Sequence, residues 1–261
     1  MRGWLGGRPP SGLPDELWRK TVDGLRFLAG LDAGELSRLR ELAGRFLAEK
    51  EFTAAGGLEL TDAMRASIAV QGCLPILNLG LGCYRDWIGI VVYPDEFVVP
   101  RTVEDEFGVV HEYDDVASGE AWEGGPLLIS WRDAQMAGDG YNVVIHEFAH
   151  KLDMLNGEAD GVPPLPASIP RREWEDALFA AYDDFCARVD ALEARLGTRE
   201  ESVEEALAID PYASENPGEF FAVLSETFFE TPDIAYREYP ALYALFSRFY
   251  RQDPRGRSGD R

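Results

Sequence analysis

The segment VVIHEFAHKLD, residues 143–153, constrains the fold of this chain most strongly, because it places two histidines four residues apart. His146 and His150 are the pair, and Glu147 follows the first of them. In an α-helix, residues four apart share one face, with Cβ atoms roughly 5–6 Å apart, so both imidazoles can reach one ion. Zinc takes such ring nitrogens at about 2.0–2.1 Å. The segment therefore predicts a zinc-binding helix.

Glu147 lies about 100° around this helix from His146, at the edge of the face that the histidines share. It is too close to His146 in sequence to bind the same ion comfortably, and it is well placed to reach a water molecule on that ion. The flanking residues are mostly apolar, which predicts a buried helix. Burying imidazoles and a carboxylate without partners costs several kcal/mol, and a metal would supply partners. The alternative is a core helix that matches the pattern by chance, although two of the chain's 3 histidines stand here.

A third ligand is needed, because a catalytic zinc site usually has three protein ligands and a water molecule. The remaining histidine, His111, lies upstream in a predicted strand or loop. The other donors are carboxylates of a later predicted helix, namely Glu215, Glu219, Glu226 and Glu230. They stand among Phe, Val and Leu residues, so a position on the inner face is expected for at least one. Spacing alone leaves open which of them closes the site.

The order of predicted elements indicates an α+β fold with one modest sheet. Capping residues and helical spacing predict helices within residues 31–50, 60–73, 171–196, 214–230 and 239–252, besides the motif helix, which Asn142 would cap. Asp32 would cap the first, and Thr61 or Asp62 the second. Short apolar runs predict strands within residues 87–94, 96–100, 107–113 and 126–131. Residues 124–131 are a candidate edge strand, either one that a substrate backbone would join or an ordinary sheet edge.

The ends of the chain differ from its middle. Residues 1–14 are rich in Gly and Pro and are expected to form a flexible arm. Residues 15–253 would form a single domain, with a helical N-terminal part to about residue 80. Residues 254–261 are polar and are expected to be a disordered tail.

The net charge of the chain limits the classes of partner that it can bind. The 261 residues include 25 Lys and Arg against 47 Asp and Glu, a formal net charge of −22, which disfavours direct binding to nucleic acid. Residues 102–131 and 200–236 hold no Lys or Arg, which is typical of solvated faces or of a surface for a cation or a basic partner. The sequence shows no apolar leader or membrane span, and its three cysteines form no CxxC pair. We therefore expect a cytoplasmic protein with reduced thiols and no membrane partner.

Three sequence blocks resemble a known family. HEFAHKLD is followed by YASENPGEFFAVLSETFF, residues 212–229, and then by RFYRQDP. In this order they resemble the Mlc titration factor A family of bacterial zinc peptidases, gluzincins related to the catalytic domain of anthrax lethal factor. The resemblance covers most of the chain, without the residues before 14 and after Pro254. It implies a zincin-like metallopeptidase domain with a small mixed sheet, an HExxH active-site helix, and helical N- and C-terminal parts.

The resemblance also implies roles for individual residues. One Zn²⁺ per chain would bind His146, His150 and Glu219, the glutamate that opens EFFAV, and Glu147 would be the general base. Tyr212 lies seven residues before Glu219, and a tyrosine at this offset aids the transition state in the lethal-factor type. A capping or packing tyrosine is the alternative.

The function implied by the resemblance is hydrolysis of peptides. Family members are described as aminopeptidase-like on small substrates and as binding the glucose-system repressor Mlc. We therefore expect a cytosolic zinc metallopeptidase that acts on small peptides or peptide ends. The alternative is a regulatory protein that sequesters a Mlc-like transcriptional repressor and has a latent or weakly active zinc site. Asp153 and Glu226 are expected either to hold a ligand imidazole or to face solvent.

Overall fold

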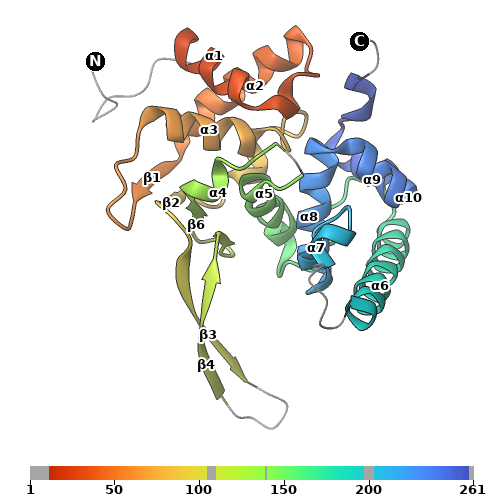
Figure 1. Cartoon of the computed structure of the whole chain (residues 1–261). Coiled ribbons are helices and arrows are strands. Elements are labelled where there is room, and N and C mark those ends of the chain that lie inside the picture. Colours follow the sequence, from red (N-terminus) through yellow and green to blue (C-terminus); the bar gives the residue numbers. More distant parts are fainter. Residues whose placement is uncertain (1–11, 105–109, 139, 197–202, 259–261) are drawn as a thin grey trace.

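The computed structural model describes residues 12–104, 110–138, 140–196 and 203–258 and shows an α+β fold (Figure 1). The side chains of residues 101–104, 111–113, 204 and 205 also lie outside this description. Helices from both halves of the chain surround a small mixed sheet, and a hairpin projects from the body. The predicted fold class is confirmed, and the arrangement is compatible with a zincin-like fold. In the described ranges, every helix is too short or too polar to cross a membrane.

The N-terminal part is helical, and its local signals explain where the helices begin. It contains α1 (Asp15–Gly24), η1 (Arg26–Leu28), α2 (Ala33–Glu49), α3 (Asp62–Cys73) and η2 (Leu81–Tyr84). The Asp32 carboxylate accepts the N–H of Glu35 at 2.7 Å, and the Glu35 carboxylate accepts the N–H of Asp32 at 3.0 Å. This capping box, and the cap formed by Thr61 before α3, confirm the predicted helix starts.

The sheet has four strands in the order β1-β2-β6-β5, of which β1 (Glu51–Ala54), β2 (Gly89–Tyr93) and β6 (Leu127–Ser130) run parallel. The short strand β5 (Gly119–Ala121) pairs antiparallel with β6 and forms one edge. The prediction of an edge strand at residues 124–131 is therefore wrong, because β6 is flanked by β2 and β5. All four residues of β6 are buried, as expected for an interior strand.

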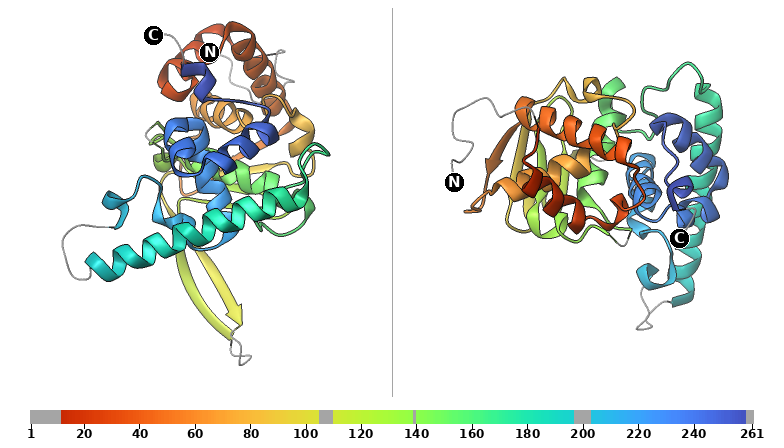
Figure 2. Two further views of the ribbon diagram at one scale, coloured as in Figure 1. Left: turned by 90° about the vertical axis from the view of Figure 1, so that its right-hand side faces the viewer. Right: turned by 90° about the horizontal axis from the view of Figure 1, so that it is seen from above.

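The two other predicted strands form a separate sheet. β3 (Phe97–Glu104) and β4 (Val110–Ala117) pair antiparallel from Phe97 opposite Ala117 to Glu104 opposite Val110. This hairpin extends away from the helices, as Figure 1 and the left view of Figure 2 show. The single sheet expected from the sequence is thus two sheets. His111 belongs to β4, but its side chain lies outside the described residues.

The C-terminal half supplies the helices that surround the motif. They are α4 (Trp131–Ala134), α5 (Val143–Asp153), η3 (Met154–Asn156), α6 (Arg171–Leu196), α7 (Val203–Ala206), η4 (Pro211–Ser214), α8 (Pro217–Glu230), α9 (Pro232–Glu238), α10 (Pro240–Tyr250) and η5 (Arg255–Ser258). Helix α8 lies beside α5 in the core, and the long helix α6 lies on the outside (Figures 1 and 2). In the C-terminal core, the rings of Trp174 and Phe246 stack with centroids 5.4 Å apart.

Both chain ends contact the domain where they are described. Residues 1–11 of the predicted arm lie outside the described ranges, whereas Leu13 is buried and its carbonyl accepts Nε of Arg40 at 3.0 Å. In the predicted tail, Arg257 donates to Glu35 and Gln252, both at 2.9 Å. The part of the tail up to this arginine therefore packs against the N-terminal helices.

Candidate metal centre

Helix α5 presents its two histidines from a rigid position. Its N-cap is Asn142, as the sequence predicted, and the Asn142 side chain accepts the N–H of Ile145 at 2.9 Å. All 11 residues of α5 are buried. On the face away from the site, Phe148 packs against an aromatic cluster that includes Tyr84, with ring centroids 5.1 Å apart. The helix is therefore anchored by its apolar face, and its imidazoles are directed toward α8.

The start of α8 fixes the position of Glu219. Pro217 occupies the first turn, and the side chain of Asn216 accepts the N–H of Glu219 at 3.0 Å. Gly218 allows close packing, because a Cβ there would lie 2.5 Å from the carbonyl oxygen of Ala159. The loop after α5 thus lies against the first turn of α8. This places Glu219 across from the histidines.

Three side-chain atoms converge between the two helices. The Nε2 atom of His146 lies 2.9 Å from Oε2 of Glu219, and Nε2 of His150 lies 3.1 Å from the same oxygen. The two Nε2 atoms are 3.1 Å apart. Burial alone would raise the pKa of Glu219, but hydrogen bonds with both imidazoles hold it below its usual range. The predicted ligand set is therefore brought together in the folded chain.

The residues present fit a zinc ion by their chemistry. The three possible ligand atoms are two imidazole nitrogens and one carboxylate oxygen, and they all lie within 4.8 Å of one another. In a tetrahedral site with bonds of about 2.0–2.1 Å, ligand atoms stand roughly 3.3 Å apart, so only a small expansion is needed. Two imidazoles and a glutamate are a known donor set of catalytic zinc. The cluster is thus compatible with a bound metal ion.

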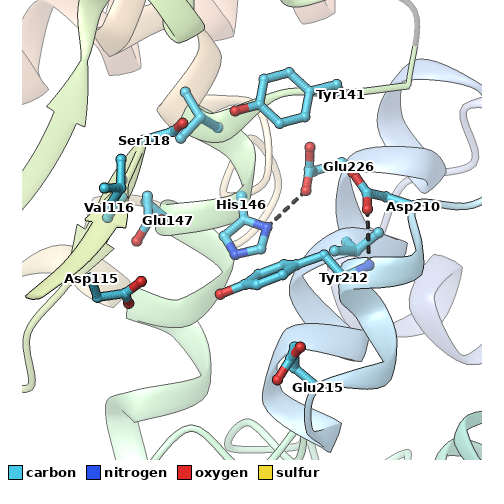
Figure 3. Close-up of a pocket in the computed structure, with 14 residues that line it drawn as sticks. Asp115, Val116, Ser118, Tyr141, His146, Glu147, Asp210, Tyr212, Glu215 and Glu226 are labelled. Carbon is cyan, nitrogen blue, oxygen red and sulfur yellow. Dashed lines mark hydrogen bonds and ion pairs between the residues drawn. The ribbon is translucent and has the colours of Figure 1, made fainter. Parts of the chain in front are cut away.

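Glu226 orients His146 through the ring nitrogen that faces away from Glu219. Its Oε1 contacts Nδ1 of His146 at 2.8 Å (Figure 3), and its Oε2 accepts the N–H of Asn142. This leaves Nε2 of His146 to face the centre. Burial alone would lower the pKa of His146, whereas its contacts with Glu219 and Glu226 raise that pKa above the usual value. Of the two alternatives for Glu226, the structure shows contact with the imidazole.

The remaining candidates from the sequence lie elsewhere. Glu215 is exposed, and Glu230 accepts the backbone N–H groups of Gly138 and Gly140, both at 2.9 Å. Asp153 is fully buried, but its Oδ2 accepts the N–H of Gly161 at 2.7 Å. Nδ1 of His150 makes no hydrogen bond within the described part of the chain. Asp153 therefore supports the loop beside α8 and does not hold an imidazole.

Glu147 lies beside the cluster and outside it. Its side chain is 4% exposed, and its Oε2 has no hydrogen-bond partner among the described residues. Burial raises the pKa of Glu147 to about 8, which is near the pH at which a general base works best. Gly119 of β5 makes room for this carboxylate, because a Cβ at Gly119 would lie 2.5 Å from Oε1. No signal in the sequence indicated the role of this glycine.

Tyr212 lies on the opposite side of the centre, in η4. Its ring centroid is 6.1 Å from that of His146, and its side chain points into the same cavity (Figure 3). The N–H of Tyr212 donates to Oδ1 of Asp210 at 2.9 Å, which fixes the turn. Partial burial and the charge of Glu219 raise the pKa of the phenol, so the hydroxyl stays a donor. The position therefore allows contact with a molecule bound beside His146.

The cleft at the centre consists of two adjoining cavities. The first, of about 550 Å³, extends toward the hairpin, and the second, of about 490 Å³, extends toward the loop after α5. Four residues line both of them, namely Gly119, His146, Glu147 and Tyr212. His146 and Glu147 thus lie where the two cavities meet, while His150 and Glu219 line the second cavity.

Comparison with known proteins identifies the class of protein. Residues 7–251 match the family described as "Glucose-regulated metallo-peptidase M90". The match covers nearly the whole chain, including both helices that form the centre. The chain therefore belongs to this metallopeptidase family.

Curated relatives carry one shared name, "Mlc titration factor A". The relative from Serratia proteamaculans is 42% identical over 233 residues, which are 88% of this chain and 85% of that protein. The relative from Klebsiella pneumoniae subsp. pneumoniae is 40% identical over 253 residues, 95% of this chain and 90% of the relative. The relative from Yersinia pestis is 37% identical over 257 residues, 97% of this chain and 90% of the relative. The similarity to Mlc titration factor A proteins confirms the resemblance found in the sequence.

Proposed function

We propose that this chain is a cytoplasmic zinc-dependent peptidase that hydrolyses small peptides or peptide ends, with aminopeptidase-like action. The observation that carries the proposal is the convergence of His146, His150 and Glu219 on one point, beside the buried carboxylate of Glu147. Membership of a metallopeptidase family supports the same reaction class. The two histidines and Glu219 would hold one zinc ion per chain.

Glu147 and Tyr212 each have a task in this reaction. A zinc ion, when bound, supplies a Lewis acid that polarises the scissile carbonyl and acidifies water. Glu147 accepts a proton from the attacking water and passes it to the amine that leaves as the C–N bond breaks. Tyr212 donates a hydrogen bond to the carbonyl oxygen as it becomes negative, an interaction worth about 2.7–4 kcal/mol in other enzymes. Tyr212→Phe should then lower kcat and keep zinc.

The test combines metal analysis with a single variant. Protein purified without chelator should contain about one zinc per chain by elemental analysis, because the described residues bring together one cluster of three ligand candidates. Glu147→Gln should keep that zinc, because Glu147 is not a ligand, and should lose hydrolysis of chromogenic amino-acid and peptide substrates. Protein that takes up no zinc on titration refutes the proposal. Wild-type turnover in the Glu147→Gln protein removes Glu147 from the mechanism.

A second function is suggested by the name of the relatives. "Mlc titration factor A" says that those proteins titrate Mlc, and we propose that this chain likewise binds a Mlc-like transcriptional repressor. The net charge of −22 favours a basic partner surface over nucleic acid. Glu147→Gln separates the two functions, since it removes the general base and leaves the surface unchanged. Repressor binding that is retained in this variant, measured by calorimetry, shows that the functions are independent.

A further inference from the structure

Glu230 binds the loop that leads into helix α5. It is the last residue of α8, and its Oε2 accepts the N–H groups of Gly138 and Gly140, both at 2.9 Å. Its Oε1 accepts Nδ2 of Asn142 at 2.7 Å. Both glycines have positive φ angles, 137° and 97°, which residues with a side chain rarely adopt. One carboxylate thus holds both the backbone of the loop and the side chain of Asn142, the N-cap of α5.

The surroundings of Glu230 are unfavourable for a charged group. Burial raises the pKa of Glu230 to about 7, and the charge of Glu226 acts in the same direction, whereas hydrogen bonds from the loop lower that pKa. The C-terminal end of a helix also carries partial negative charge. The donors of the loop are therefore what stabilises a carboxylate at this position. The same hydrogen bonds hold the loop against the end of α8.

The amide of Asn142 fits this network in one orientation. Its Nδ2 donates to Oε1 of Gln71 at 2.9 Å as well as to Glu230, and its Oδ1 accepts the N–H of Ile145 at 2.9 Å. Asn142 and Gln71 are both fully buried. An amide turned over would direct its oxygen at two acceptors and its NH2 group at a donor. Glu230 and Gln71 therefore fix the side chain of Asn142.

Asn142 connects this network to the metal centre. Its backbone N–H donates to Oε2 of Glu226, whose Oε1 contacts Nδ1 of His146 at 2.8 Å. The carboxylate of Glu226 thus lies between Asn142 and His146, and its position depends on where the N-cap is held. His150 has no such link, because its Nδ1 makes no hydrogen bond among the described residues. The network therefore acts on His146.

We propose that Glu230 is a positioning residue of the metal centre. Through Asn142 and Glu226, it fixes the imidazole of His146 before an ion binds. Glu230 lines neither cavity of the cleft, so it acts without contact with a substrate. A ring that is already oriented needs no ordering when the metal binds, which tightens the site. The inference rests on the zinc site of the proposed function and adds a residue outside its ligand set.

Glu230→Gln tests the proposal on the full-length protein. The amide keeps the size of the side chain, but its one oxygen can accept either the glycine N–H groups or Asn142, and its NH2 group opposes the other donor. Zinc affinity, measured by competition with a chromogenic chelator, should fall about tenfold. Glu238→Gln is the matched control, because Glu238 ends α9, is likewise partly buried, and contacts Arg188 at 3.0 Å outside both cavities. Its zinc affinity should equal that of the wild type.

A double-mutant cycle distinguishes positioning from a general loss of stability. If Glu230 acts through Glu226, the effects of the two substitutions on zinc affinity are not additive. Glu230→Gln should then change zinc affinity by less than about twofold in Glu226→Ala protein. A further loss of about tenfold in that background overturns the proposal, as does wild-type affinity in the single variant.

Urea unfolding of the metal-free proteins shows whether each variant is folded. If Glu230→Gln is not, Glu230→Asp takes its place, since it keeps the carboxylate and withdraws it by one methylene. Its zinc affinity should fall about fivefold, and by less than about twofold in Glu226→Ala protein. Equal losses in the two backgrounds overturn the proposal. A wild type that binds zinc, beside variants of unchanged affinity, overturns only this inference, whereas a wild type that binds no zinc overturns the proposed function as well.

Discussion

The carboxylate of Glu147 occupies the space that a side chain on Gly119 would fill. A Cβ on this glycine would lie 2.5 Å from Oε1 and 2.6 Å from Cγ of Glu147. Glycine thus allows β5 to approach α5 closely enough to bury the carboxylate beside His146. The φ angle of Gly119 is not in the left-handed region, so a larger residue here would conflict with the Glu147 side chain and not with the backbone conformation.

Gly119→Ala should therefore displace Glu147 without touching a metal-ligand candidate. We expect zinc content near that of the wild type and a loss of about 100-fold in kcat, since a shift of 1 Å at a reacting group can have this effect. Overpacking should lower the free energy of unfolding by about 1–3 kcal/mol. Elemental analysis, steady-state kinetics and urea unfolding measure the three quantities.

Gly24→Ala is the matched control for that variant. A Cβ on Gly24 would meet no heavy atom within 4 Å, and its φ is likewise outside the left-handed region. Its kcat and zinc content should equal those of the wild type. Unchanged kcat in Gly119→Ala would mean that the contact does not position the general base.

In metal-free protein, the burial of Glu147 should make the free energy of unfolding depend on pH. Burial raises the pKa of Glu147 from 4.5 to about 8, so the folded state holds more protons than the unfolded state between these values. The stability that the protonated Glu147 contributes is therefore lost as pH rises from about 4.5 to 8. Metal-free Glu147→Gln lacks the titration, and its free energy of unfolding should exceed that of the wild type by more at pH 8 than at pH 5. A difference that does not change with pH would contradict the burial.

Local signals predicted the helix that carries the motif. Its N-cap Asn142, its apolar flanks and the spacing of its histidines all act within one or two helical turns, so they can be read without knowledge of the fold. The capping box at Asp32 and Glu35 was predicted for the same reason. In both cases the signal and the structure that it determines lie in the same short segment.

Non-local contacts could not be predicted in this way. Glu219 and Glu226 occupy the same helix among the same apolar residues, and only the packing of α8 on α5 separates their contacts. Within residues 124–131, Leu127–Ser130 is an interior strand because Gly119–Ala121, a segment without a strand-like pattern, pairs beside it. The requirement for glycine at position 119 likewise arises from a side chain 28 residues away in sequence, through contact in space.

Lys151 should stabilise the turn that leads from β5 to β6. Its side chain is buried, and Nζ donates to the carbonyls of Trp122 at 2.5 Å, Gly125 at 2.9 Å and Pro126 at 3.4 Å. Lys151→Met keeps the apolar stem and removes this donor. Backbone N–H groups still donate to the carbonyls of Trp122 and Pro126, so it is the carbonyl of Gly125 that loses its donor, which should cost about 1–3 kcal/mol of stability. Thermal and urea unfolding measure the loss. Lys20→Met, at an exposed ion pair with Glu16, is the control and should change stability by less than about 1 kcal/mol. An equal loss in both variants would contradict the role of Lys151.

The choice between Glu219 and Glu226 as ligand can be decided by zinc affinity. Glu219 is the carboxylate that contacts both Nε2 atoms, whereas Glu226 contacts Nδ1 of His146 and the N–H of Asn142. Glu219→Ala should therefore lose tight zinc binding and activity. Glu226→Ala should weaken zinc affinity or activity by about 10–100-fold, because it removes only the contact that orients the imidazole of His146.

Competition with a chromogenic chelator measures both affinities on one scale. Glu215→Ala is the control, since this glutamate stands near the same helix start and makes no contact with either histidine in the described structure. Its zinc affinity should equal that of the wild type. If Glu226→Ala loses the metal while Glu219→Ala retains wild-type affinity, the ligand assignment is wrong, and the centre would have to form around Glu226 by rotation of the His146 ring. The affinities of these three variants thus decide which carboxylate closes the centre.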